Sequence, residues 1–351
     1  MNRGDAAKEP TRLGTVPVVA ALACLVGAGL LGLLIGPVEL GARSVVRELI
    51  DRLPLLAVPS GLTEREVAIL WELRLPRVLV AGLVGATLAV AGAAYQGVFR
   101  NPLSDPYLLG VAAGAGLGAT LAVAYVPRDP AWPLDPLPVA AFAGALAAVA
   151  VTYALGVAGT RARTATTLIL AGVAVAAFFT AVQTYVQQRE VDTLRQVYAW
   201  LLGALGAVGW QQAALVTPYA LVSWAALLAH RRLLDVLSVG DEEASSLGLR
   251  VGRVRLVVVV AASLGTAAAV SVAGLIGFVG IIVPHAIRLL IGSSYRVLVP
   301  LSVLFGAAFM IVADLLARTL VAPAELPIGV ITAFVGAPFF LLVLRSTGRP
   351  A

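Results

Sequence analysis

LGTVPVVAALACLVGAGLLGLLIG, residues 13–36, is a run of 24 residues without one charged side chain. A membrane-spanning helix needs about 20 predominantly apolar residues, so this run is long enough to cross a bilayer. Basic residues precede it, as in a signal peptide, but it exceeds the roughly 7 to 15 apolar residues of a signal core and no A-x-A-like site closes it. We therefore expect a retained first transmembrane helix.

Similar runs recur along the whole chain. Hydrophobic residues make up 60% of the 351 positions and charged residues 13%, whereas soluble domains are near half apolar and a quarter charged. We predict an all-α, polytopic membrane protein with about ten transmembrane helices in a single transmembrane domain, residues 1–351, surrounded by a lipid bilayer. The expected spans are 13–36, 75–98, 107–126, 138–158, 166–187, 198–229, 253–272, 274–292, 297–321 and 328–346.

The charges between these spans predict an orientation. If the N-terminus is cytoplasmic, that side carries 15 of the 25 basic residues and 7 of the 19 acidic ones. Cytoplasmic loops of membrane proteins carry an excess of Lys and Arg, so both termini are predicted to be cytoplasmic. Residues 1–12 then form a cytoplasmic tail, 37–74 an external segment and 231–252 a cytoplasmic segment. This side-dependent charge accounts for the basic pI, and a nucleic-acid partner is not expected.

The polar groups that catalysis needs are scarce. Lys8 is the only lysine and lies outside any G-x-x-x-x-G-K-[ST] pattern, so the chain has no P-loop for ATP. His230 and His285 are the only histidines and show no metal-ligand spacing. Cys24, the only cysteine, is expected to be a small buried apolar residue. We expect no catalytic residue, metal site or cofactor in this chain, and no enzyme activity of its own.

One acidic residue, Asp314, lies inside a predicted span. An intramembrane carboxylate is a candidate proton or sodium relay, which would suit an ion-coupled secondary transporter. Arg318 lies four residues later, where it can pair with Asp314 on one helix face. A structural ion pair and an ion-coupling site are therefore both open.

Two arginines stand where the external segment enters the second span, in Arg74-Leu75-Pro76-Arg77. Proline is compatible with the first turn of a helix, where its missing N–H is harmless. We expect both guanidinium groups to face the outer aqueous side. They are either anchors that reach the membrane interface or binding residues.

The cytoplasmic segment contains an acidic stretch, Gly240-Asp241-Glu242-Glu243-Ala244-Ser245-Ser246-Leu247-Gly248. Acidic residues favour a helix N-terminus, and Gly248 suits a position just after a helix C-terminus. The stretch is either a short helix suited to docking another protein or a solvated loop.

Five motifs follow one another in this frame of ten spans: RLPR (74–77), NPLSDPYLLG (101–110), GDEEASSLG (240–248), GLIGFVGIIVPH (274–285) and ELPIGVITAFVGAP (325–338). Together they resemble the FecCD-type permeases, the membrane subunits of binding-protein-dependent ABC importers for iron-siderophores, haem and vitamin B12. The resemblance covers about residues 13–345. It implies the ABC importer permease fold and the translocation of a bulky metal chelate across the cytoplasmic (inner) membrane, with an iron-siderophore as the default substrate and cobalamin or haem next.

The same resemblance implies partners. The chain would form a homodimer and bind two cytoplasmic ATP-binding subunits, which hold ATP and Mg²⁺, and an external substrate-binding protein. Its central pathway would be lined mainly by the fifth span, residues 168–187, with Gln183 near the outer end. The resemblance assigns binding-protein docking to Arg74, Arg77 and Arg318. It assigns ATPase coupling to Asp241, Glu242, Ala244, Leu247 and Gly248. It places a cytoplasmic gate at Thr164 and Ala165, where Ala165 replaces a second hydroxyl residue.

Overall fold

The computed structural model describes residues 12–52, 59–127, 134–158 and 165–347, and this part of the chain is helical without a strand. Seven of its helices are long and apolar enough to cross a membrane, and three shorter helices are also apolar. The long ones are α1 (Thr15–Leu34), α4 (Leu75–Phe99), α6 (Pro136–Ala158), α7 (Ala165–Arg189), α9 (Trp210–Leu237), α11 (Val251–Ala273) and α13 (Tyr295–Thr319). The shorter ones are α5 (Val111–Tyr125), α12 (Val279–Leu290) and α14 (Ile328–Thr347).

Nine of the ten expected spans lie within a few residues of one of these helices. The span predicted at 198–229 is wrong in its first part, because α8 (Leu194–Leu201) ends there and α9 begins only at Trp210. Gly203 adopts a left-handed conformation with φ 74°, which glycine reaches without steric cost. The backbone N–H of Ala204 then donates to the carbonyl of Ala273, at 3.0 Å. The chain between α8 and α9 is thus held against the end of α11 rather than continuing as a helix.

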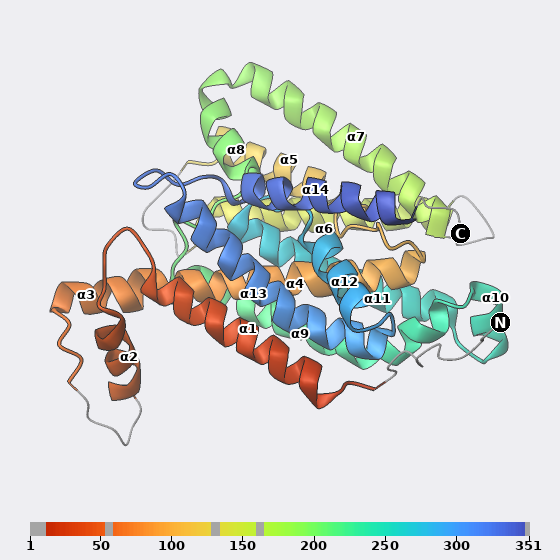
Figure 1. Ribbon diagram of the computed structural model, residues 1–351. Helices are drawn as coiled ribbons and strands as arrows, with labels where there is room; N and C mark the ends of the chain where they lie inside the picture. The colour runs from red at the N-terminus through yellow and green to blue at the C-terminus, as the bar shows by residue number, and fades with distance from the viewer. Residues whose placement is uncertain (1–11, 53–58, 128–133, 159–164, 348–351) are drawn as a thin grey trace.

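Helix α4 forms the centre of the bundle (Figure 1) and packs against α9, α11, α12 and α13. In the apolar stretch of 18 residues within the span that contains α4, 89% of the residues are buried. In the corresponding stretches of α1 and α7, 22% are buried. The middle of α4 consists largely of Ala, Gly and Val, and small side chains let helices approach closely in a membrane. The sequence of α4 therefore suits a helix with neighbours on all sides, while α1 and α7 are peripheral.

The close packing of α4 depends on glycine at particular contacts. A Cβ atom at Gly92 would overlap the backbone of Gly280, at the N-terminal end of α12. We predict that Gly92→Ala lowers the free energy of unfolding by about 1–3 kcal/mol, because neither backbone can move without disturbing other contacts. Gly29 in α1 has nothing within 4 Å of such a Cβ, so Gly29→Ala is the matched control. Thermal unfolding of the purified variants in detergent measures both, and an equal effect of the two substitutions would contradict the prediction.

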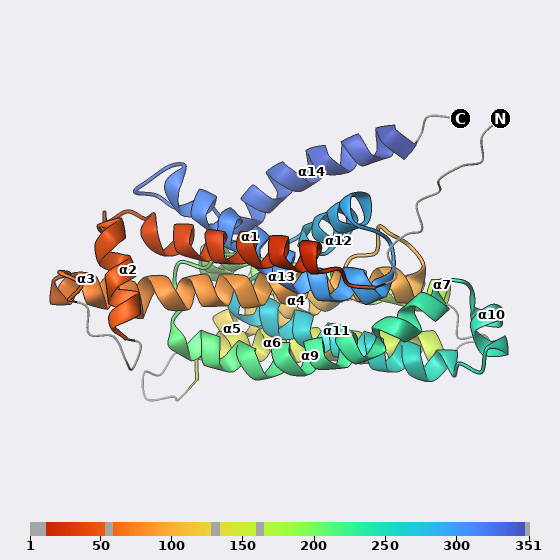
Figure 2. The ribbon, with the colours of Figure 1, turned by 60° about the horizontal axis from the view of Figure 1, so that its bottom comes forward.

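The two ends of the bundle differ in what they carry. The segment predicted to be external forms α2 (Ala42–Asp51), α3 (Glu64–Ala68) and a π-helical turn, Ile69–Arg74, that runs into α4. A capping box between Thr63 and Glu66 begins α3. Figure 2 shows α2 and α3 at one end, and α10 (Asp241–Ser246), the start of α1 and the end of α14 at the other. The segments predicted to be external and cytoplasmic therefore lie at opposite ends.

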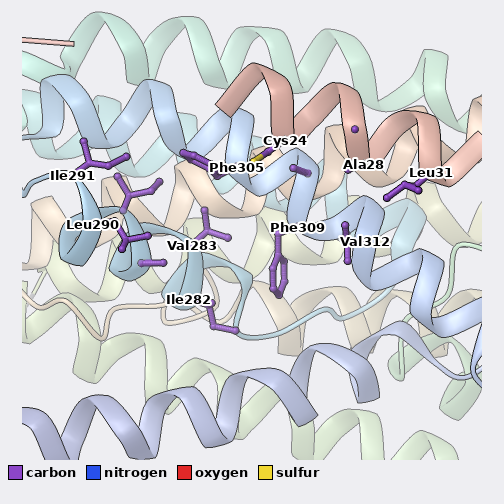
Figure 3. Close-up of a pocket in the computed structure, with 14 residues that line it drawn as sticks. Cys24, Ala28, Leu31, Ile282, Val283, Leu290, Ile291, Phe305, Phe309 and Val312 are labelled. Atoms are coloured by element: carbon purple, nitrogen blue, oxygen red, sulfur yellow. The ribbon is translucent and has the colours of Figure 1, made fainter. Parts of the chain in front are cut away.

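An apolar groove of about 550 Å³ runs between α1, α12 and α13, with Phe305, Phe309 and Cys24 among its lining residues (Figure 3). Cys24 is exposed, so the expectation of a buried cysteine is wrong. Residue 24 lies on a peripheral helix and lines this open groove. Hydropathy alone does not distinguish a helix face that packs against protein from one that stays exposed. The groove offers no polar side chain, so it is not the candidate site.

Candidate functional site

An ion-pair cluster joins three segments at the end of the bundle that carries α2 and α3. Arg77, in the first turn of α4, donates from Nε to both carboxylate oxygens of Asp314 of α13, each at 3.0 Å, and from Nη2 to Oδ1 at 2.8 Å. The same guanidinium contacts Glu325, which follows α13, at 2.7 Å from Nη1 and 2.9 Å from Nη2. The side chains of Asp314, Arg77 and Glu325 are 2%, 12% and 40% exposed. The cluster thus runs from the protein interior to the surface.

Arg318 is the second cation of this cluster. Its Nε lies 3.8 Å from Asp314 Oδ2, so the contact predicted between these residues is present. Its Nη2 donates to the carbonyl of Gly32 in α1, at 2.5 Å. Since Arg77 binds Asp314 at shorter distances, Arg318 is the secondary partner of this carboxylate. The side chain of Arg318 is only 3% exposed, so it does not present a free charge to solvent.

Arg74 is also buried, at 4% exposure. Its guanidinium donates to the carbonyls of Leu33, at 2.7 Å, Leu34, at 3.0 Å, and Val38. The last carbonyls of a helix lack intrahelical partners and carry partial negative charge. Arg74 therefore caps the C-terminal end of α1, and the expectation that it faces the aqueous side is wrong. Arg74 lies at the same end of the bundle as α2 and α3, but the end of α1 covers it and separates it from solvent.

A cavity of about 460 Å³ opens beside the ion-pair cluster. Arg77, Asp314 and Glu325 line it together with residues of the chain between α8 and α9. Arg77 holds the pKa of Glu325 below its ordinary value through their hydrogen bonds, so this carboxylate remains ionised near neutral pH. Of the three arginines predicted to dock a partner, only Arg77 borders this cavity.

At the opposite end, residues 241–246 form the short helix α10, which the sequence offered as one of two readings. Asp241 Oδ2 accepts from Arg255 Nη2 of α11 at 2.9 Å, and its Oδ1 lies 3.7 Å from Arg100 Nη2 at the end of α4. Ala244 is buried. One carboxylate therefore ties α10 to two transmembrane helices.

The remaining predicted coupling residues lie on the outer side of α10. Glu242 is exposed, and Leu247, which ends the helix, is 71% exposed. Gly248 has φ 83° and its N–H donates to the Ser245 carbonyl at 2.9 Å, as expected of a glycine after a helix end. The arrangement displays an apolar side chain to solvent on a helix that is fixed to the bundle.

The predicted gate and pathway residues are only partly placed. Thr164 lies outside the described residues, and Ala165 is the first residue of α7. Gln183 is buried at 8% exposure and lies against Gly116 of α5. A central pathway along the fifth span stays a prediction. Among the described residues, no three His, Cys, Asp or Glu side chains could together hold a metal ion. The absence of a metal site in the whole chain stays a prediction.

Sequence reasoning missed three participants: Glu325, Arg255 and Arg100. Each is separated from its partner by 14 to 248 residues, and the only available signal was charge. An ionised group at membrane depth needs a partner, which predicted that a partner of Asp314 exists. It did not predict which helix supplies it.

Comparisons with known proteins agree with this architecture. The FecCD transport family matches residues 24–346. The cobalamin import system permease protein BtuC of Halobacterium salinarum is 43% identical over 286 residues, which are 82% of this chain and 76% of that protein. The hemin transport system permease protein HmuU of Yersinia pestis is 42% identical over 282 residues, 78% of this chain and 83% of that protein.

A solved structure of a metal-chelate-type ABC transporter in an inward-facing conformation superimposes with a TM-score of 0.81, at 28% identity over 94% of this chain and 98% of that one. The matched region includes both ends of the bundle described above, and the ion-coupled alternative is not favoured. The chain belongs to the FecCD transport family and is the permease subunit of an ABC importer.

Proposed function

We propose that this chain conducts a bulky metal chelate across the cytoplasmic membrane, powered by ATP that two separate subunits bind with Mg²⁺ and hydrolyse. Cobalamin and hemin stand in the names of the relatives described above, and a ferric siderophore belongs to the same class of large chelates. The chain itself would hold no cofactor and catalyse no reaction. The observation that carries the proposal is α10, which presents Leu247 to solvent while Asp241 links it to α4 and α11.

The orientation follows from the same feature. ATP-binding subunits are cytoplasmic, so α10 and the predicted cytoplasmic segment, residues 231–252, would face the cytoplasm. The start of α1 and the end of α14 lie at that end (Figure 2), which supports cytoplasmic termini. The external segment, residues 37–74, would then face the binding protein.

A homodimer would enclose the pathway between two copies of α7. This helix lies apart from the centre of the bundle (Figure 1), and its exposed face carries Thr180, Thr184 and Gln188 at intervals of four residues. Such a polar stripe is not expected on a helix surrounded by lipid alone, although the Thr184 hydroxyl donates to the Thr180 carbonyl at 2.9 Å. A second copy facing this stripe across a water-filled space accounts for it.

Docking of the binding protein is proposed at the external cavity, with Arg77 as the contact that can still be reached. Arg74 and Arg318 would contribute indirectly, because their bonds to carbonyls of α1 hold the end of this helix in place. An acidic residue of the binding protein could then compete with Glu325 for Arg77, because Glu325 is the exposed member of the pair. Arginine suits this exchange, since it binds carboxylates in a bidentate manner.

We predict that Arg77→Gln lowers the affinity of the assembled transporter for its binding protein about tenfold at low salt, as loss of a charge-assisted bond implies. Arg47→Gln, an exposed change on α2, is the matched control and should have little effect. Binding-protein-stimulated ATP hydrolysis measures both after folding has been checked by thermal unfolding. Unchanged stimulation by a folded Arg77→Gln variant would contradict docking at this residue.

A further inference from the structure

Four arginines surround one cavity at the end of the molecule that carries α10. The cavity measures about 490 Å³ and is lined by Arg12, Leu13, Arg231, Arg232 and Arg296. Arg12 precedes α1, Arg231 and Arg232 belong to the last third of α9, and Arg296 is the second residue of α13. Three transmembrane helices thus bring their basic residues to one place.

The charge of this cavity is poorly compensated. Asp235 lies 3.2 Å from Arg296 Nε, but its other oxygen accepts from the backbone N–H of Tyr295 at 2.6 Å, at the start of α13. Within the described part of the chain, no carboxylate lies within ion-pair distance of Arg12, Arg231 or Arg232. Like charges held together are mutually destabilising, so the site favours an anion with more than one acceptor oxygen.

The surroundings of the cavity indicate an amphiphile. Leu13 forms part of its wall, and α1 continues from there with Val16 at 77% and Val19 at 64% exposure. An anion bound to the arginines would therefore lie beside an apolar, lipid-facing helix. Basic pockets between transmembrane helices on the cytoplasmic side suit anionic lipid headgroups, and guanidinium forks bind phosphate oxygens in pairs.

We propose that this cavity binds the phosphodiester headgroup of an anionic phospholipid, whose acyl chains lie along α1. The site is separate from the external cavity and from α10, and it does not depend on which substrate the chain transports. Lipid bound there would join the starts of α1 and α13 to α9. It would thereby hold together helices that contribute to both ends of the bundle.

Native mass spectrometry of the delipidated full chain, titrated with phosphatidylglycerol and with phosphatidylcholine, tests the site. We expect preferential retention of phosphatidylglycerol, and Arg231→Gln with Arg232→Gln should weaken it about thirtyfold, at the usual contribution of each basic residue near an anionic surface. Arg250→Gln with Arg253→Gln removes two exposed arginines at the same end but outside the cavity. This matched control should leave the affinity unchanged.

Three results would overturn the proposal: equal affinity for the two lipids, equal loss in the control variant, or protection from thermal unfolding by inorganic phosphate alone as large as that by phosphatidylglycerol. The last result would assign the cavity to a free anion. If the double variant loses its fold together with lipid binding, Arg12→Gln tests the site instead. It alters a residue outside any helix, and a fivefold weaker retention is expected.

Discussion

Asp314→Asn should lower the free energy of unfolding by about 3–5 kcal/mol, because it leaves buried arginine without its counter-charge. Asp314 is 2% exposed and is the carboxylate that Arg77 and Arg318 share. Arg77 would keep Glu325, but Arg318 would keep only the Gly32 carbonyl as a strong partner. Thermal unfolding of the purified chain in detergent, and the yield of folded protein, measure the loss.

Glu325→Gln is the matched control, since it removes the exposed carboxylate from the same guanidinium. Exposed ion pairs contribute at most about 1 kcal/mol, so the unfolding temperature should fall much less. Adding Arg318→Met to Asp314→Asn should recover part of the loss by removing the orphaned charge. Equal destabilisation by Asp314→Asn and Glu325→Gln would show that the buried pair has no special structural role.

Leu247→Glu should prevent productive assembly with the ATP-binding subunits while leaving the fold intact. Leu247 is 71% exposed at the end of α10, so a charge there costs the isolated chain little. If the side chain inserts into an apolar groove of the ATPase, its loss removes a central contact. Such contacts contribute about 2 kcal/mol or more, which is about thirtyfold in affinity. Co-purification with the ATPase and ATP-driven uptake measure the effect.

The control for this variant is Leu247→Met, which keeps an apolar side chain of similar volume. It should assemble and transport nearly as the unchanged chain does. Full assembly by Leu247→Glu would contradict the coupling role of α10, whatever the substrate.

The spans could be predicted from the sequence because the length of an apolar run is a local property. The bilayer fixes the required length, and turn residues mark where each run ends. The failure at 198–229 has an equally physical reason. Ala204, Gly203 and their neighbours are as apolar as a helix interior, but they form a loop because the backbone bonds to Ala273 and to the start of α14.

The sites were less predictable, because they depend on which helices are neighbours. Arg74 and Arg77 are three residues apart in one motif, yet one caps α1 and the other binds Asp314. Hydropathy does not reveal that the end of α1 covers residue 74. The pairing of residues 77 and 314 likewise requires α4 and α13 to be adjacent, which no local pattern encodes. By contrast, α10 could be proposed from its acidic start and its terminal glycine.

ATP hydrolysis on separate subunits, rather than an ion gradient, should drive substrate through this chain. Uptake of radiolabelled cobalamin, haem or a ferric siderophore into proteoliposomes tests this most directly, with the chain reconstituted alongside its ATP-binding subunits and its binding protein. We predict uptake of one of these chelates that requires ATP on the side of the membrane where the ATP-binding subunits lie. This uptake persists when proton and sodium gradients are collapsed. Uptake by the chain alone, driven by a proton or sodium gradient without ATP, would contradict it.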